Sequence, residues 1–183
     1  MRPEHAAIVR ETYAALAPRA GVLVDRFYAR LFAARPEIRG LFQVNLAKQA
    51  QHLSAALALI VRNIDRLDML EEPLRELGAR HVAYGVLNDH YPDFREAMMG
   101  ALRETAGPLW SAPAESAWGA ALVAVTQAML RGAAQVAFEA ARAIAGDQPG
   151  TRLFRVAEPE KPKTVVVRLG EGTSGVSPLD ETR

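Results

Sequence analysis

Residues 70–91 read LEEPLRELGARHVAYGVLNDHY, and they are the part of the sequence that says most about the fold. Leu70, Leu74 and Leu77 recur at the three- and four-residue spacing of one helix face. His81 continues the same apolar stripe, and a glycine-containing polar turn follows it. The stretch therefore predicts a helix that presents one imidazole on its apolar face.

Apolar residues keep this helical spacing through most of the chain, and no sustained alternating segment typical of a strand occurs in the first 145 residues. Prolines lie near the expected starts of several segments, as they do at the first turns of helices. The pattern predicts an all-α fold with helices at residues 3–17, 19–34, 36–42, 46–66, 69–83, 92–106 and 112–145.

The composition changes at Gly146. Residues 146–183 contain five glycines and four prolines. We expect a helical domain at residues 1–145 and an irregular, Gly/Pro-containing C-terminal tail at 146–183. Two short apolar runs in the tail, at 153–156 and 165–169, leave open a two-stranded β-ribbon or the start of a second domain.

Charge and cysteine content exclude several classes of function. The 183 residues carry 22 Lys+Arg and 21 Asp+Glu, a net charge of +1, which gives no electrostatic case for a nucleic-acid partner. The absence of cysteine excludes thiolate chemistry, disulfides and iron–sulfur clusters. We see no signal peptide and no apolar run near the roughly 20 residues that span a bilayer, so we expect a cytoplasmic protein without membrane insertion.

The histidines are few, and one of them differs from the rest. His5 lies near the N-terminus, His90 lies in a polar turn, and His52 lies at the rim of its helix. His81 lies on an apolar face, where a core histidine bonded to the backbone is one interpretation. An axial ligand of haem iron is the other, because the porphyrin supplies four ligands and zinc would need three or four from the protein.

Two more polar side chains lie on apolar helix faces. Tyr28 interrupts the stripe of its helix, and Gln49 lies one turn before Leu53 on the next long helix. Each has a simple explanation, a hydroxyl at the surface and a solvated amide. Together, opposite a histidine-bound iron, a phenol O–H and an amide N–H would both donate hydrogen bonds to a polarised diatomic ligand.

At these residues the sequence resembles the globin family, in particular bacterial single-domain globins and the haem domain of flavohaemoglobins. The likeness covers about residues 3–145, and its motifs occur in the family's order. They are FYARLF at 27–32 followed by Arg35-Pro36-Glu37, then Leu41-Phe42, Gln49 with Leu53, LGARH at 77–81 with Tyr84-Gly85 and Asp89-His90-Tyr91, and Ala117-Trp118-Gly119.

The resemblance implies a globin fold, a three-on-three helical sandwich around a pocket for haem b. It implies that His81 is the proximal iron ligand and that Tyr28 and Gln49 are the distal donors. The remaining pocket residues implied are Leu53 above the iron, Phe42 packed on the haem, Tyr91 beside the proximal histidine, and Arg80 with His52 at the haem propionates.

The chain departs from flavohaemoglobins in two places. Their last helix carries a glutamate that hydrogen-bonds the proximal histidine, whereas the matching positions hold Ala133 and Gln135, with Glu139 about a turn later. A neutral His81 favours reversible oxygen binding over O–O activation. In the tail, residues 150–156 resemble the linker into a reductase domain, but about 38 residues are too few to form one, so enzymatic turnover would need an external reductase.

These observations leave several functions open. The first is a haem globin that reversibly binds dioxygen, and also CO and NO, with high affinity. The alternative is a nitric oxide dioxygenase served by the external reductase, and a second alternative is a gas or redox sensor acting through a partner protein. A globin that has lost haem is the fourth, and the set of pocket residues argues against it.

Overall fold

The computed structural model describes residues 1–42 and 45–146, and within them it is built from helices and connecting turns. The predicted all-α fold is confirmed for this part of the chain, whereas the tail proposed at 146–183 and its β-ribbon lie almost wholly outside it. The α-helices are α1 (Pro3–Leu16), α2 (Ala20–Ala34), α3 (Leu46–Arg62), α4 (Glu71–Ala83), α5 (His90–Ala106) and α6 (Ala112–Gly146). The 3-10 segments are η1 (Ala17–Arg19), η2 (Pro36–Leu41), η3 (Ile64–Leu70) and η4 (Gly107–Leu109).

The predicted helix at 46–66 is wrong in its last turn. Helix α3 ends at Arg62, and Asn63 leads into η3, within which Arg66 has non-helical backbone angles (φ −132°, ψ 51°). The side chain of Asn63 donates a hydrogen bond to the carbonyl of Leu59 at 2.9 Å, a local bond that competes with continued helix. The chain therefore turns here from α3 toward α4.

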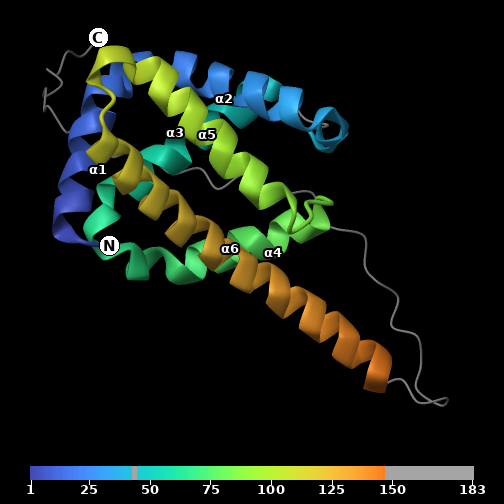
Figure 1. Cartoon of the computed structure of the whole chain (residues 1–183). Helices are drawn as coiled ribbons and strands as arrows, with labels where there is room; N and C mark the ends of the chain where they lie inside the picture. The colour runs from blue at the N-terminus through green and yellow to red at the C-terminus, as the bar shows by residue number, and fades with distance from the viewer. Residues whose placement is uncertain (43–44, 147–183) are drawn as a thin grey trace, which may run out of the picture. The chain divides into compact units, whose positions relative to one another are not determined.

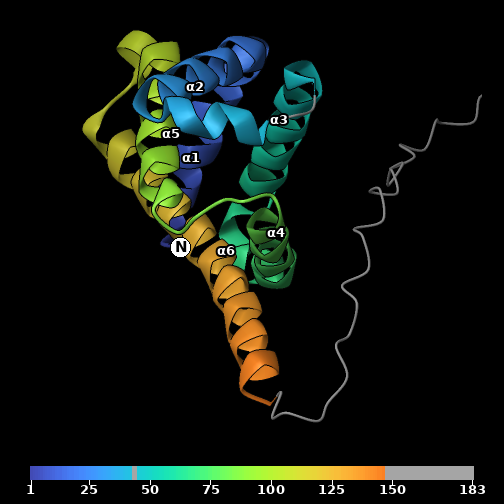
Figure 2. The same cartoon turned by 90° about the vertical axis from the view of Figure 1, so that its right-hand side faces the viewer.

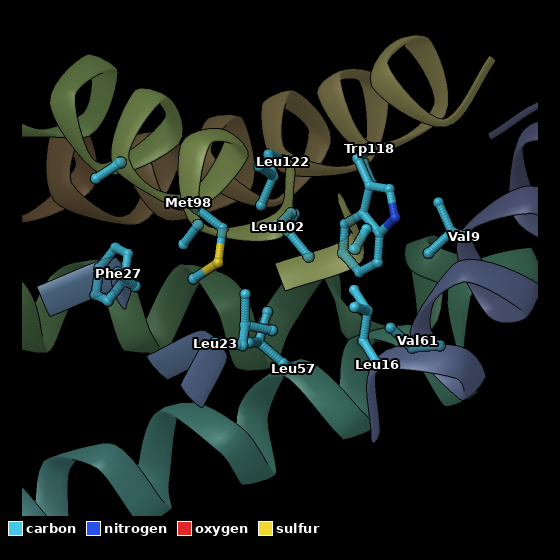
Figure 3. Packing of buried hydrophobic residues seen from close by; sticks show 14 of the residues in the cluster. Val9, Leu16, Leu23, Phe27, Leu57, Val61, Met98, Leu102, Trp118 and Leu122 are labelled. Carbon is cyan, nitrogen blue, oxygen red and sulfur yellow. The ribbon is translucent and has the colours of Figure 1, made fainter. Parts of the chain in front are cut away.

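A large apolar cluster joins α1, α2, α3, α5 and α6. Trp118, 1% exposed, lies between α6 and α1, and its ring centroid is 6.4 Å from that of Tyr13. Figure 3 shows Trp118 beside Leu102, with Val9 and Leu16 on the α1 side. This cluster is the main core of the domain.

Polar side chains of α2, and of Arg35 just after it, contact α5. Arg30 pairs with Glu104, Arg26 donates to the hydroxyl of Thr105 at 3.2 Å, and Arg35 pairs with Asp93 at 2.6 Å. Figure 1 shows the two helices crossing at one end of the molecule, and Figure 2 shows α3 above α4 on one side of it. Helices α2, α3 and α4, which carry most of the predicted pocket residues, pack against α1, α5 and α6, and α5 itself carries Tyr91.

Helix α6 corrects the expectation that no apolar run approaches the length that spans a bilayer. By length and hydropathy alone, Ala112–Ile144 would reach across a membrane. The same helix packs against α1, α4 and α5, and Trp118, Leu122 and Val125 are buried there. Packing inside the fold accounts for the apolar character of the first half of the helix, whereas Phe138 and Ile144 further along it are exposed.

Candidate functional site

His81 lies in the last turns of α4 with its ring tied to the helix backbone. Its Nδ1 is 2.8 Å from the carbonyl oxygen of Leu77. A carbonyl oxygen only accepts hydrogen bonds, so Nδ1 carries the hydrogen and donates it. In the neutral imidazole the lone pair is then on Nε2, which is the state that binds a metal ion.

Burial favours this neutral state. Desolvation lowers the pKa of His81 below its usual value, the hydrogen bond to Leu77 opposes that shift, and the charge of Arg80 adds to it. A histidine must lose its proton before it coordinates a metal. The environment of His81 therefore suits ligation.

The turn that follows α4, the helix of His81, lies close to the end of η2. Gly85 has φ +85°, a conformation that glycine adopts at little cost. An ideal Cβ at Gly85 would lie 3.3 Å from Cδ2 of Leu41, the last residue of η2. The proximal turn thus touches the segment that leads into Phe42.

Tyr28 lies in a group of aromatic rings. Its ring centroid is 5.0 Å from that of Phe27, 5.7 Å from that of Phe32 and 5.6 Å from that of Phe42. The contacts with Phe27 and Phe42 are edge-to-face, which aromatic quadrupoles favour. Burial raises the pKa of Tyr28 to about 12, so its phenol stays protonated and can donate a hydrogen bond near neutral pH.

Helix α3 supplies the other two distal residues. Its first turn is capped by Asn45, whose side chain accepts a hydrogen bond from the backbone N–H of Ala47 at 2.9 Å. Gln49 and Leu53 follow one turn apart and are half-buried. Leu53 packs against the same large apolar cluster as Tyr28 and Phe42, and of these residues Tyr28 and Phe42 are in direct contact.

Tyr91 in α5 is buried, with 5% of its surface exposed. Its hydroxyl has no hydrogen-bond partner among the residues that the structure describes. Burial raises the pKa of Tyr91, and the α6 side chains in its cluster are Val125, Ala128 and Met129, all apolar. A buried hydroxyl without a protein partner is uncommon and is open to a hydrogen bond with water or another bound group.

The predicted distal and proximal residues belong to two apolar clusters, and these clusters share side chains. Ile60 and Leu67 each pack against the cluster around Phe27 and also against the cluster that contains Leu74 and Tyr91. The predicted stripe is confirmed as packing, since Leu70 and Leu74 are buried and Leu77 is partly buried beside them.

Two predicted residues lie apart from this arrangement. His52 on α3 and Arg80 on α4 are both exposed, and their contact with haem propionates stays a prediction. On α6, Ala133 is buried, while Gln135 is exposed and donates to the carboxylate of Glu139 at 2.7 Å. Glu139 is itself exposed and is engaged by that bond on the surface.

Sequence reasoning quoted Leu41 and Gly78 only as parts of motifs, and it assigned no role to them or to Gly132. An ideal Cβ at Gly78 would lie 2.7 Å from Cα of Met129, and one at Gly132 would lie 2.8 Å from Cα of Arg75. The sequence did hold a signal. A glycine within a helix that is otherwise rich in alanine and leucine usually has a packing reason.

The side chains present suit a haem. Among residues 1–42 and 45–146, no group of three His, Asp or Glu side chains could hold a metal ion without a prosthetic group. Haem iron needs only one ligand from the protein, and the imidazole of His81, with Nδ1 bonded to the backbone, would supply it through Nε2. The protonated phenol of Tyr28, beside Phe42, would supply a hydrogen-bond donor near the bound group.

Comparison with known proteins decides the family. A model of the globin family matches residues 25–129. The chain belongs to the globin family. The expected globin fold and the resemblance to flavohaemoglobins are thereby confirmed, and membership of the family implies haem binding.

Curated relatives of this globin are flavohemoproteins. That of Bordetella pertussis is 28% identical over 97% of this chain and 45% of its own length. That of Deinococcus radiodurans is 30% identical over 86% of this chain and 40% of its own length, and that of Burkholderia sp. (strain TH2) is 31% identical over 86% and 41%. The chain therefore spans less than half the length of these relatives.

Solved structures agree on the fold. An engineered carbene transferase, made from a candidate nitric oxide dioxygenase of Rhodothermus marinus, has a TM-score of 0.70 at 27% identity, covering 77% of this globin and 99% of that protein. A bacterial globin from Campylobacter jejuni has a TM-score of 0.65 at 20% identity, covering 75% and 99%.

Proposed function

We propose that this globin binds haem b and reversibly binds dioxygen, and also CO and NO, with high affinity. The observation that carries the proposal is the hydrogen bond from Nδ1 of His81 to the carbonyl of Leu77, which leaves Nε2 for the iron. Haem supplies the iron centre to which the diatomic gas binds.

The chain's own residues would then divide the work. His81 would hold the iron as a neutral imidazole, and the protonated phenol of Tyr28 would donate to the ligand from the opposite side. Gln49 would provide a second donor, and the apolar side chains of Phe42 and Leu53 would exclude water from the pocket.

Absorption spectra test the proposal. We expect the purified protein to show a Soret band that shifts on reduction with dithionite and shifts again with CO. His81→Ala should abolish or scramble that spectrum, while His90→Ala, at the first residue of α5, should leave it unchanged. A protein without a Soret band, even after haem is added to it, would overturn the proposal.

A second proposal is nitric oxide dioxygenation with an external reductase, which would oxidise NO to nitrate with dioxygen. It is supported by the flavohemoprotein relatives and by the similarity to a candidate nitric oxide dioxygenase. Within residues 1–42 and 45–146 no carboxylate bonds to the Tyr91 hydroxyl, and the last-helix positions that carry the glutamate in flavohaemoglobins hold Ala133 and Gln135, which favours ligand binding instead.

Turnover separates the two functions. With a supplied reductase and its nicotinamide donor, a dioxygenase should consume NO continuously and release nitrate in proportion. Oxygen binding alone should give one stoichiometric burst of NO consumption per haem, after which the rate falls to that of the reductase without the globin.

A further inference from the structure

Helices α4 and α6 touch backbone to backbone at two points. At the first point an ideal Cβ on Gly78 would lie 2.7 Å from Cα of Met129. At the second a Cβ on Gly132 would lie 2.8 Å from Cα of Arg75. In both cases the obstacle is main chain, which cannot swing aside as a side chain can. Neither position therefore accepts a side chain unless the two helices move apart.

The two contacts also set the register between the helices. Along α4 the contacting residues run from 75 to 78, while along α6 they run from 132 to 129, so the helices cross in opposite directions. Two contacts one turn apart resist sliding as well as separation. The ion pair between Glu71 and Arg131, at 2.7 Å, joins the same two helices at the surface.

His81 lies directly beside this crossing. It follows Gly78 by three residues, which is roughly 4.5 Å along an α-helix. Its ring bonds to the carbonyl of Leu77, the residue that precedes Gly78. The imidazole is therefore attached to the turn of α4 that α6 holds in place.

We infer that Gly78 and Gly132 are positioning residues for the iron ligand: they hold α4 at backbone contact with α6 and thereby set where Nε2 of His81 lies. The inference rests on the proposed haem function. An added Cβ at either glycine would push α4 away from α6 and carry His81 with it, changing the iron–histidine bond.

The test compares Gly78→Ala and Gly132→Ala with the wild type. The matched control is Gly119→Ala, also in α6, where an added Cβ would meet no other atom within 4 Å. The readouts are the iron–histidine stretching band of the ferrous protein in resonance Raman spectra and the rate at which haem transfers to an excess of a haem-free acceptor globin.

We expect both glycine variants to shift the iron–histidine band and to lose haem faster, by about 10–100-fold, the range typical of changes in the outer shell of a metal site. Gly119→Ala should match the wild type in both measurements. Leu16→Ala, a core truncation in α1 that leaves both glycines and the packing of α4 on α6 in place, should lower stability and leave the band unmoved.

An iron ligand that is not attached to the protein distinguishes a positioning role of the two glycines from a general role in packing. In His81→Gly supplied with free imidazole, the iron ligand is no longer attached to α4. Adding Gly132→Ala to that protein should then leave the iron–imidazole band unchanged. An equal shift with attached and detached ligand would overturn the inference, and so would two alanine variants that cannot fold even with haem.

Failure of this inference and failure of the proposed function give different results. A wild-type protein without a Soret band would refute haem binding, and the inference with it. A wild-type protein with an iron–histidine band that neither glycine variant moves would refute the positioning role alone.

Discussion

At the scale of single residues, Tyr28 is the side chain that we propose sets how tightly the site holds its ligand. The phenol lies among Phe27, Phe32 and Phe42, and burial keeps it protonated. These rings restrict where the hydroxyl can point and shield it from water. Such a donor stabilises a polarised ligand more than an exposed one would.

We predict that Tyr28→Phe raises the dissociation rate of dioxygen by about one to two decades. A hydrogen bond to a charged or polarised group contributes about 1.5–3 kcal/mol, and about 1.4 kcal/mol corresponds to one decade. Stopped-flow displacement of O₂ by CO measures the rate. Tyr13→Phe, the same substitution beside Trp118, should leave it unchanged, and an unchanged rate in Tyr28→Phe would show that the hydroxyl does not face the ligand.

Tyr28 also predicts a pH dependence of stability. Its pKa is raised from 10.0 to about 12, so the folded protein holds this proton more tightly than the unfolded chain. The resulting stabilisation is present below pH 10 and is lost as pH rises from 10 toward 12. Urea unfolding across this range should show a smaller loss in Tyr28→Phe than in the wild type, and equal losses would contradict the burial of the phenol.

At the scale of elements, the positions of α3 and α4 decide whether the site exists. Helix α4 is held by its glycine contacts with α6, and its last turn meets Leu41 through Gly85. Helix α3 depends instead on its capped first turn and on Leu57 and Val61, which enter the core. The capped turn lies just before Gln49, so the cap contributes to the distal side.

We predict that Asn45→Ala lowers the free energy of unfolding by about 1 kcal/mol, because the backbone N–H of Ala47 loses its side-chain acceptor. Thermal unfolding checks the value, with Asn88→Ala in an exposed turn as the control. Asn45→Ala should also weaken the hydrogen bonding of Gln49 to the ligand, seen as a change in the carbonyl stretching band of the CO complex. An unchanged stability would contradict the cap.

At the scale of the whole molecule, the described part of the chain carries its own core. Both apolar clusters are made of residues within the compact unit Met1–Asp147. Trp118, Leu102 and Leu16 join α1, α5 and α6 at one end of it, and Leu74 with Met129 joins α4 and α6 at the other (Figure 3 shows the first group).

We predict that a fragment of residues 1–147 folds and binds haem as the full chain does. All side chains assigned to the proposed site lie inside that fragment, as do both core clusters. Circular dichroism, the Soret band and the CO-bound spectrum of the fragment should match those of the full chain. Loss of haem from the fragment would show that residues 148–183 complete the pocket.

Most helix bounds and the candidate for the iron ligand could be predicted from the sequence alone. Helix periodicity and proline positions depend on neighbours within four residues, so α1, α2, α4 and α6 are predicted to within a residue or two of their bounds. His81 was found because it continues the stripe of Leu70, Leu74 and Leu77. The break after Arg62 was missed because a side-chain bond from Asn63 competes with a helix that the pattern would continue.

How these helices pack against one another is seen in the tertiary structure and could not be predicted from the sequence. The contacts of Gly78 with Met129 and of Gly85 with Leu41 join residues more than 40 positions apart, and no local pattern records them. The unpartnered hydroxyl of Tyr91 is likewise visible only once α6 lies against it with apolar side chains. Local hydrogen bonds and periodicity can be recognised along the chain, whereas the partner of a buried group depends on which elements pack together.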